Sequence, residues 1–240
     1  MDVVDLESAR DDLAAASRIL VDQGVFDAAG HVSMRHPDNP QRYLMSRSLA
    51  PQLVTAGDIM EFTLDSEPVD AHAPRPFIER FIHGEIYRAR PDVNAVAHGH
   101  SQSVVPFGIV GVPMMATYHN AAFIAAGVPV FDIRKKFGST DIVIDTAAKG
   151  AALAQSLGDK CVALLRAHGF VAVGPSLPAA VFRAIFTEIN ARIQLRAMSL
   201  GGSTDIGAMA YLDAEEGRKA DVVNLATVGR SWELWKKRIS

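Results

Sequence analysis

The residues best suited to chemistry are two histidines one residue apart, His98 and His100. They follow the apolar segment 94–97, which is typical of a short buried strand. Alternate residues of a strand point to the same side, so both imidazoles can reach one point. His168 stands in a similar place, because it follows the apolar segment 161–165. Three histidines can hold a divalent metal with one coordination position open, so we expect these three to be metal ligands.

Glycines adjoin these histidines, and Gly99 and Gly169 would let the backbone of each segment approach its neighbour closely. The alternative is that the three histidines are unrelated and only cap the ends of strands.

Glu79 is the candidate for proton transfer. It lies in the segment 77–90, whose apolar residues have helical spacing, and His83 shares its face one turn later. A carboxyl group among Phe and Ile side chains is a candidate for a raised pKa and for acid/base catalysis. The alternative is an exposed carboxylate that pairs with Arg80 or a lysine.

The segments around these residues predict both helices and strands. Helices are expected at 6–26, 77–90, just before 108, and at 120–126, 145–158, 178–200 and 214–237. Strands are expected at 31–35, 43–46, 59–64, 94–97, 128–131, 141–144, 161–165 and 170–174. Strands in hairpins with flanking helices favour an α/β sandwich around a largely antiparallel sheet. We expect a single domain over 1–240 with a C-terminal helical extension.

Composition excludes several classes of protein. Of 240 residues, 49% are apolar and 21% charged, which is enough for a large core and rules out global disorder. A net charge of −3 does not suit a nucleic-acid binder, and no apolar run is long enough for a membrane span. The acidic N-terminal segment and the single cysteine, Cys161, lead us to expect a cytoplasmic protein.

Five motifs occur in an order that resembles the class II aldolase/adducin family over about residues 8–200. They are Gly30-His31-Val32-Ser33, Ser46-Arg47-Ser48, Glu79 with His83, His98-Gly99-His100-Ser101 and Arg166-Ala167-His168-Gly169. The resemblance implies a three-layer α/β/α sandwich around a mostly antiparallel central sheet. It also implies a homo-oligomer, commonly a homotetramer, with active sites at subunit interfaces.

The same resemblance implies that His98, His100 and His168 hold one divalent metal per chain and that Glu79 is the acid/base near it. Zinc is the first expectation, and Mn²⁺, Fe²⁺ and Co²⁺ are compatible with the same ligands.

The departures from the sugar-phosphate aldolases concern the substrate. Where those enzymes use small hydroxyl and amide groups to hold phosphate, this chain has His31, Arg47 and the pair Phe77-Ile78. An arginine can bind a carboxylate through two hydrogen bonds, and the apolar pair offers no phosphate donor. We therefore expect a small-molecule substrate that is flat and carboxylated, bound by His31, Ser33, Arg47, Ser48 and Phe77.

Tyr118 and His119 occupy the region where the aldolases carry a tyrosine that reaches a neighbouring subunit. His119 aligns with that tyrosine, so both residues are candidate proton donors, and packing at an interface is the alternative for each.

The segment Arg75 to Tyr87 most resembles a branch of the family linked to aromatic catabolism, which includes decarboxylases of the dihydroxyphthalate type. The prediction is a metal-dependent carbon–carbon lyase that decarboxylates a hydroxylated aromatic acid or its ring-cleavage product. The alternatives are an aldolase or 4-epimerase acting on a sugar phosphate, a non-catalytic adducin-like module, and an oxidative enzyme that uses iron at the same histidines.

Overall fold

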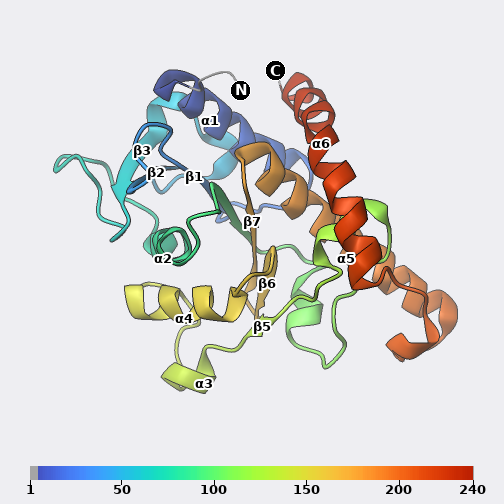
Figure 1. Ribbon diagram of the computed structural model, residues 1–240. Coiled ribbons are helices and arrows are strands. Elements are labelled where there is room, and N and C mark those ends of the chain that lie inside the picture. The colour runs from blue at the N-terminus through green and yellow to red at the C-terminus, as the bar shows by residue number, and fades with distance from the viewer. Residues whose placement is uncertain (1–4, 240) are drawn as a thin grey trace.

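Seven of the eight expected strands pair into one sheet at the centre of the molecule (Figure 1), in a computed structural model that describes residues 5–239. The order across the sheet is β3-β2-β1-β4-β7-β6-β5, and all neighbours are antiparallel except β5 and β6. The strands are β1 (His31–Arg35), β2 (Arg42–Ser46), β3 (Ile59–Thr63), β4 (Ala95–Gly99), β5 (Val130–Phe131), β6 (Val162–Leu165) and β7 (Gly169–Gly174).

Helices cover both faces of this sheet (Figure 1). They are α1 (Leu6–Asp22), α2 (Phe81–Ala89), α3 (Arg134–Phe137), α4 (Ala147–Leu157), α5 (Leu177–Gly201) and α6 (Ala214–Arg238). Short 3₁₀ segments are η1 (Pro51–Leu53), η2 (Ala56–Asp58), η3 (Ile78–Arg80), η4 (Val105–Gly108), η5 (His119–Ile124) and η6 (Ile206–Ala208).

Two apolar cores result, because successive side chains of a strand point to opposite faces. Ala97 and Ala172 face the core formed with α1, α5 and α6. Val96 and Val171, one position earlier on the same strands, face the core formed with α2 and α4. The three-layer α/β/α sandwich with a mostly antiparallel sheet, expected from the sequence, is therefore confirmed.

One expected strand is absent: residues 141–144 form no strand in the described chain. Ile142 has a left-handed backbone (φ 61°), which interrupts an extended run, and the Ile144 amide donates to the carboxylate of Glu79 instead of to a neighbouring strand. The sequence prediction was wrong here because apolar alternation does not report backbone groups that bind a side chain.

The helix expected at 77–90 begins as the 3₁₀ segment η3 and continues as α2. Glu79 has a non-helical backbone (φ −89°, ψ 17°) inside this junction. In the described part of the chain, no helix is long and apolar enough to cross a membrane.

Candidate metal centre

Two neighbouring strands bring the three predicted ligands together. His98 is the fourth residue of β4 and His100 follows the strand, whereas His168 ends the turn between β6 and β7. Gly99 pairs with Phe170 across β4 and β7, so both histidine-bearing ends lie at the same edge. A Cβ on Gly169 would lie 2.3 Å from the Gly99 carbonyl oxygen, so the approach of these two strands requires glycine.

The three imidazoles and Glu79 form a compact cluster. One ligand atom from each of the four residues lies within 4.8 Å of the others. The ring centroids of His98, His100 and His168 are 5.0 Å apart in all three pairs. Imidazole nitrogens and a carboxylate at this spacing are the donor set that Zn²⁺ and similar divalent ions use.

Hydrogen bonds on the outer nitrogens orient two of these rings. His98 Nδ1 lies 3.0 Å from the Phe170 carbonyl oxygen, and a carbonyl can only accept, so Nδ1 carries the proton. His100 Nδ1 lies 3.2 Å from both carboxylate oxygens of Asp27. Both Nε2 atoms are buried without a hydrogen-bond partner within residues 5–239, which is the arrangement that a bound metal would complete.

Asp27 contacts His100 from the loop before β1, and no pattern in the sequence indicates this role. Burial raises its pKa, but the amide of Ala29 and the contact with His100 outweigh this and hold the pKa of the carboxyl below its usual range. An ionised Asp27 therefore accepts the proton of His100 Nδ1 and keeps Nε2 free as a ligand.

Glu79 is held by two different kinds of contact. Its Oε1 accepts a hydrogen bond of 2.9 Å from the amide of Ile144. Its Oε2 lies 3.5 Å from Nε2 of both His98 and His168. Burial opposes ionisation, but the close contacts with His168 and His98 outweigh it and lower the pKa of Glu79. The raised pKa expected from its apolar neighbours in sequence is thus corrected, because the histidines come from distant segments.

A cavity of about 380 Å³ opens beside the cluster and shares Glu79 with it. Of the predicted substrate-binding residues, His31, Ser48 and Phe77 line this cavity. The Phe77 ring lies 4.7 Å from the His31 ring, and His31 in turn lies 5.1 Å from His98. A ligand in the cavity would therefore be adjacent to the clustered histidines.

Arg47 does not line this cavity. Its Nε donates to Asp58 at 2.7 Å, so its charge is already compensated within the chain. Arg75 does line the cavity, is exposed, and makes no ion pair within the described residues. Arg75 was not among the predicted site residues, although it stands two residues before Phe77 in the segment that resembles the decarboxylase branch.

Ser33 lies behind the cavity in a buried hydrogen-bonded chain of four side chains. Its Oγ is 2.7 Å from the Tyr87 hydroxyl and 2.6 Å from His83 Nδ1, and His83 Nε2 is 2.7 Å from His31 Nδ1. Burial lowers the pKa of His83 to about 3 and raises the pKa of Tyr87. Each of these two groups is therefore neutral near pH 7.

Tyr118 and His119 stay outside this site within one chain. The Tyr118 ring packs 6.2 Å from the Phe186 ring, and its hydroxyl is buried with no hydrogen-bond partner among the described residues. Burial raises the pKa of this hydroxyl. His119 begins η5, and its carbonyl oxygen accepts a hydrogen bond of 2.8 Å from Asn224 on α6. Neither residue lines the cavity, so their catalytic roles stay predictions.

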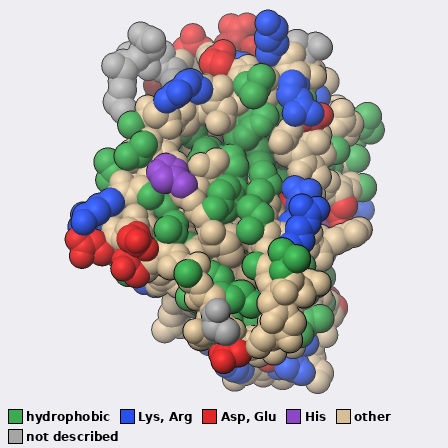
Figure 2. All heavy atoms as spheres, turned by 90° about the vertical axis from the view of Figure 1, so that its right-hand side faces the viewer, with side chains coloured by type: hydrophobic (Ala, Val, Ile, Leu, Met, Phe, Trp, Pro, Cys, Tyr) green, Lys and Arg blue, Asp and Glu red, His purple; other side chains and the backbone are tan. Residues whose placement is uncertain are grey.

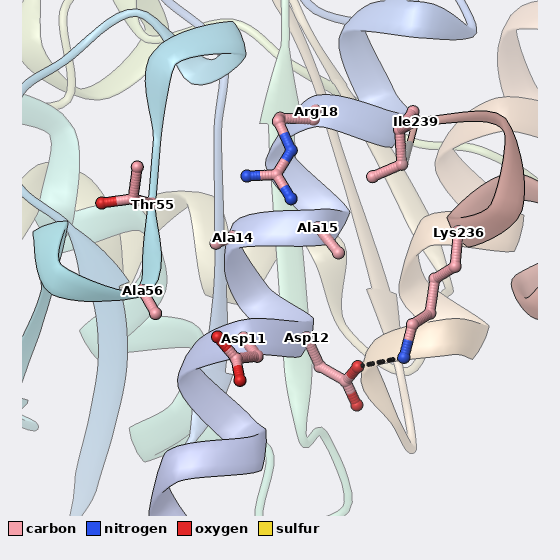
Figure 3. A pocket seen from close by; sticks show the side chains of 9 residues that line it. All are labelled: Asp11, Asp12, Ala14, Ala15, Arg18, Thr55, Ala56, Lys236 and Ile239. Atoms are coloured by element: carbon pink, nitrogen blue, oxygen red, sulfur yellow. Dashed lines mark hydrogen bonds and ion pairs between the residues drawn. The ribbon is translucent and has the colours of Figure 1, made fainter.

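A second hollow, of about 420 Å³, lies between α1, η2 and the end of α6 (Figure 3). Asp12 and Lys236 form an ion pair of 2.8 Å across it, and Arg18 also points toward it. Arg18 donates to the carbonyl of Val54. The hollow has no histidine among its lining residues and shares none of them with the cluster of His98, His100, His168 and Glu79. The pair of Asp12 and Lys236 joins α6 to α1.

The fold and the metal centre define a class of protein, and the sequence comparison agrees with it. Residues 11–195 match the class II aldolase and adducin N-terminal domain, so this chain belongs to that family. The aldolase II superfamily protein of Pseudomonas syringae has the same fold, with a TM-score of 0.78 at 23% identity over 97% of this chain and 92% of that one.

The relatives fall in the expected branch. Decarboxylase tropJ of Talaromyces stipitatus is 38% identical over 233 residues, covering 90% of this chain and 88% of that protein. The 3,4-dihydroxyphthalate decarboxylase of Arthrobacter keyseri is 30% identical over 250 residues, covering 97% of this chain and 93% of the relative. The resemblance to the decarboxylase branch is therefore confirmed.

Proposed function

We propose that this chain is a metal-dependent carbon–carbon lyase that decarboxylates a hydroxylated aromatic acid or its ring-cleavage product. The observation that carries the proposal is the cavity that joins an arginine and an apolar wall to the histidine cluster through Glu79. The two relatives named above, which are 38% and 30% identical to this chain over most of their length, are both decarboxylases.

His98, His100 and His168 would hold the metal, and Zn²⁺ is our first candidate because imidazole nitrogens suit it. A divalent ion at these histidines supplies Lewis acidity to a ligand with adjacent oxygen atoms.

Other residues of the chain bind the substrate and transfer the proton. Arg75 binds a substrate carboxylate through its guanidinium, and Phe77 and Ile78 provide an apolar surface for a flat ring. Loss of a carboxylate as CO₂ removes a charge, which an apolar surface favours. Glu79, held in place by the Ile144 amide, moves the proton that the carbon receives after CO₂ departs.

We also propose a homotetramer with active sites shared between subunits. His119, which is exposed, then reaches the cavity of a neighbouring chain, with Tyr118 beside it in the sequence. The side of the molecule where α5 and α6 lie carries gathered hydrophobic side chains (Figure 2). Exposed hydrophobic residues of these two helices include Leu195, Val222 and Val223. An apolar surface of this kind suits contact between subunits.

Release of CO₂ from a panel of hydroxylated benzoates and phthalates, with Zn²⁺ or Mn²⁺ added, tests the proposed reaction. We expect turnover of at least one acid and none of L-fuculose 1-phosphate. Efficient cleavage of that ketose phosphate without decarboxylation would establish the aldolase alternative.

A further inference from the structure

The buried chain formed by Tyr87, Ser33, His83 and His31 has a preferred direction of hydrogen bonding. The contact between Tyr87 and Ser33 joins two hydroxyl oxygens, and either could donate. Among the described residues, Ser33 Oγ, at 2.7 Å, is the acceptor available to the Tyr87 O–H. If Tyr87 donates to Ser33, both buried hydroxyl protons have an acceptor, whereas the reverse direction would leave the buried Tyr87 O–H without one among the described residues.

The proton positions on Ser33, His83 and His31 follow from the donation by Tyr87 to Ser33. Ser33 then has its own O–H left to donate, and His83 Nδ1, at 2.6 Å, accepts it. A neutral imidazole carries one proton, so the proton of His83 must be on Nε2 and is donated to His31 Nδ1 at 2.7 Å. His31 is therefore left with its proton on Nε2.

His31 Nε2 is the nitrogen that can donate a hydrogen bond to a ligand. His31 is only 3% exposed, lines the cavity beside Glu79 and Phe77, and its Nε2 has no hydrogen-bond partner in residues 5–239. The neighbouring His98 ring lies 5.1 Å away.

We propose that Tyr87, Ser33 and His83 are positioning residues that fix His31 as an Nε2–H donor to an anionic oxygen of the substrate, beside the metal-binding histidines. The inference rests on the proposed function for the identity of the site, but the hydrogen-bond direction does not depend on turnover. A carboxylate or phenolate oxygen is the matching ligand, because a hydrogen bond to a charged acceptor is stronger than one to a neutral acceptor.

Nitrogen NMR of ¹⁵N-histidine-labelled, metal-loaded protein reads the tautomer directly, with His31 assigned by loss of its signals in His31→Asn. We expect an unprotonated Nδ1 and a protonated Nε2 in the wild type. Tyr87→Phe removes the first donor while keeping the ring, so the chain can reverse and both His31 tautomers become populated.

Tyr43→Phe is the matched control. Tyr43 is also buried, its ring lies 5.4 Å from that of Tyr87, and its hydroxyl donates to the Arg80 carbonyl outside the chain. We expect the His31 tautomer to be unchanged in this variant. A wild-type His31 protonated on Nδ1, or a tautomer unaffected by Tyr87→Phe, would overturn the proposal.

Binding of 2,3-dihydroxybenzoate, measured by calorimetry, supplies a second readout. Loss of a hydrogen bond to a charged group weakens binding roughly 10- to 100-fold, and we expect a loss of that order in His31→Asn and a smaller one in Tyr87→Phe. Unchanged affinity in both variants would contradict the role of His31 as a donor. If the tautomer is as expected but no acid is decarboxylated, the proposed function fails and the hydrogen-bond direction stands.

Discussion

Glu79 connects the two parts of the site, because it lines the cavity and also contacts two of the clustered histidines. Glu79→Gln keeps the side-chain volume and an oxygen for the Ile144 amide but cannot carry the proton. We expect the variant to fold and bind metal while turnover falls about 10²–10⁴-fold, the usual contribution of a positioned acid/base. Steady-state kinetics together with metal content test this, and turnover within about threefold of the wild type would remove Glu79 from proton transfer.

Arg75 and Arg47 give a direct comparison of two candidate carboxylate ligands. Arg75→Ala removes from the cavity a charge that has no ion-pair partner in residues 5–239, so we expect KM for the acid to rise roughly 10- to 100-fold with a smaller change in kcat. Arg47→Ala breaks an ion pair with Asp58 outside the cavity, so its KM should change much less. A larger rise in KM for Arg47→Ala than for Arg75→Ala would show that Arg47, not Arg75, binds the substrate carboxylate.

The proposed metal centre depends on the close approach of strands β4 and β7. A Cβ at Gly169 would meet the Gly99 carbonyl oxygen at 2.3 Å and the His100 ring at 3.1 Å. We expect Gly169→Ala to separate the strands, lower the free energy of unfolding by about 1–3 kcal/mol and weaken metal binding.

Gly229→Ala on α6 is the control for this substitution, because a Cβ there meets nothing within 4 Å and alanine favours a helix. Denaturant unfolding and metal titration measure both effects. Wild-type stability and metal affinity in Gly169→Ala would show that the strands do not need the glycine.

The sequence predicted those parts of the molecule that local pattern determines. Apolar periodicity located most strands and helices, and alternation on a strand placed His98 and His100 on one side. It could not reveal contacts between distant segments. Asp27 behind His100, the Ile144 amide on Glu79 and the pairing of Arg47 with Asp58 all join residues brought together only by folding. Arg75 was overlooked for the same reason, because its lack of a partner depends on the neighbours that folding supplies.

At the scale of the whole molecule, a shared site predicts that two inactive variants can restore each other. His168→Ala damages the metal centre of its own chain, and His119→Ala removes a donor that we assign to the neighbouring chain. Mixed oligomers would then contain some sites with both residues intact. We expect each variant alone to be inactive and the mixture to recover part of the wild-type activity. No recovery after subunit exchange has been confirmed would contradict the shared site.

Metal content is the most direct test of the central claim that the clustered histidines form a catalytic metal centre. Elemental analysis of wild type, His100→Ala and His72→Ala, each loaded with Zn²⁺ and dialysed, is paired with CO₂ release from the best acid in the panel. His72 is exposed and outside the cluster, so it controls for the loss of a histidine. The account predicts about one metal per chain and full activity in wild type and His72→Ala, with both lost in His100→Ala. Stoichiometric metal and wild-type CO₂ release in His100→Ala would contradict it.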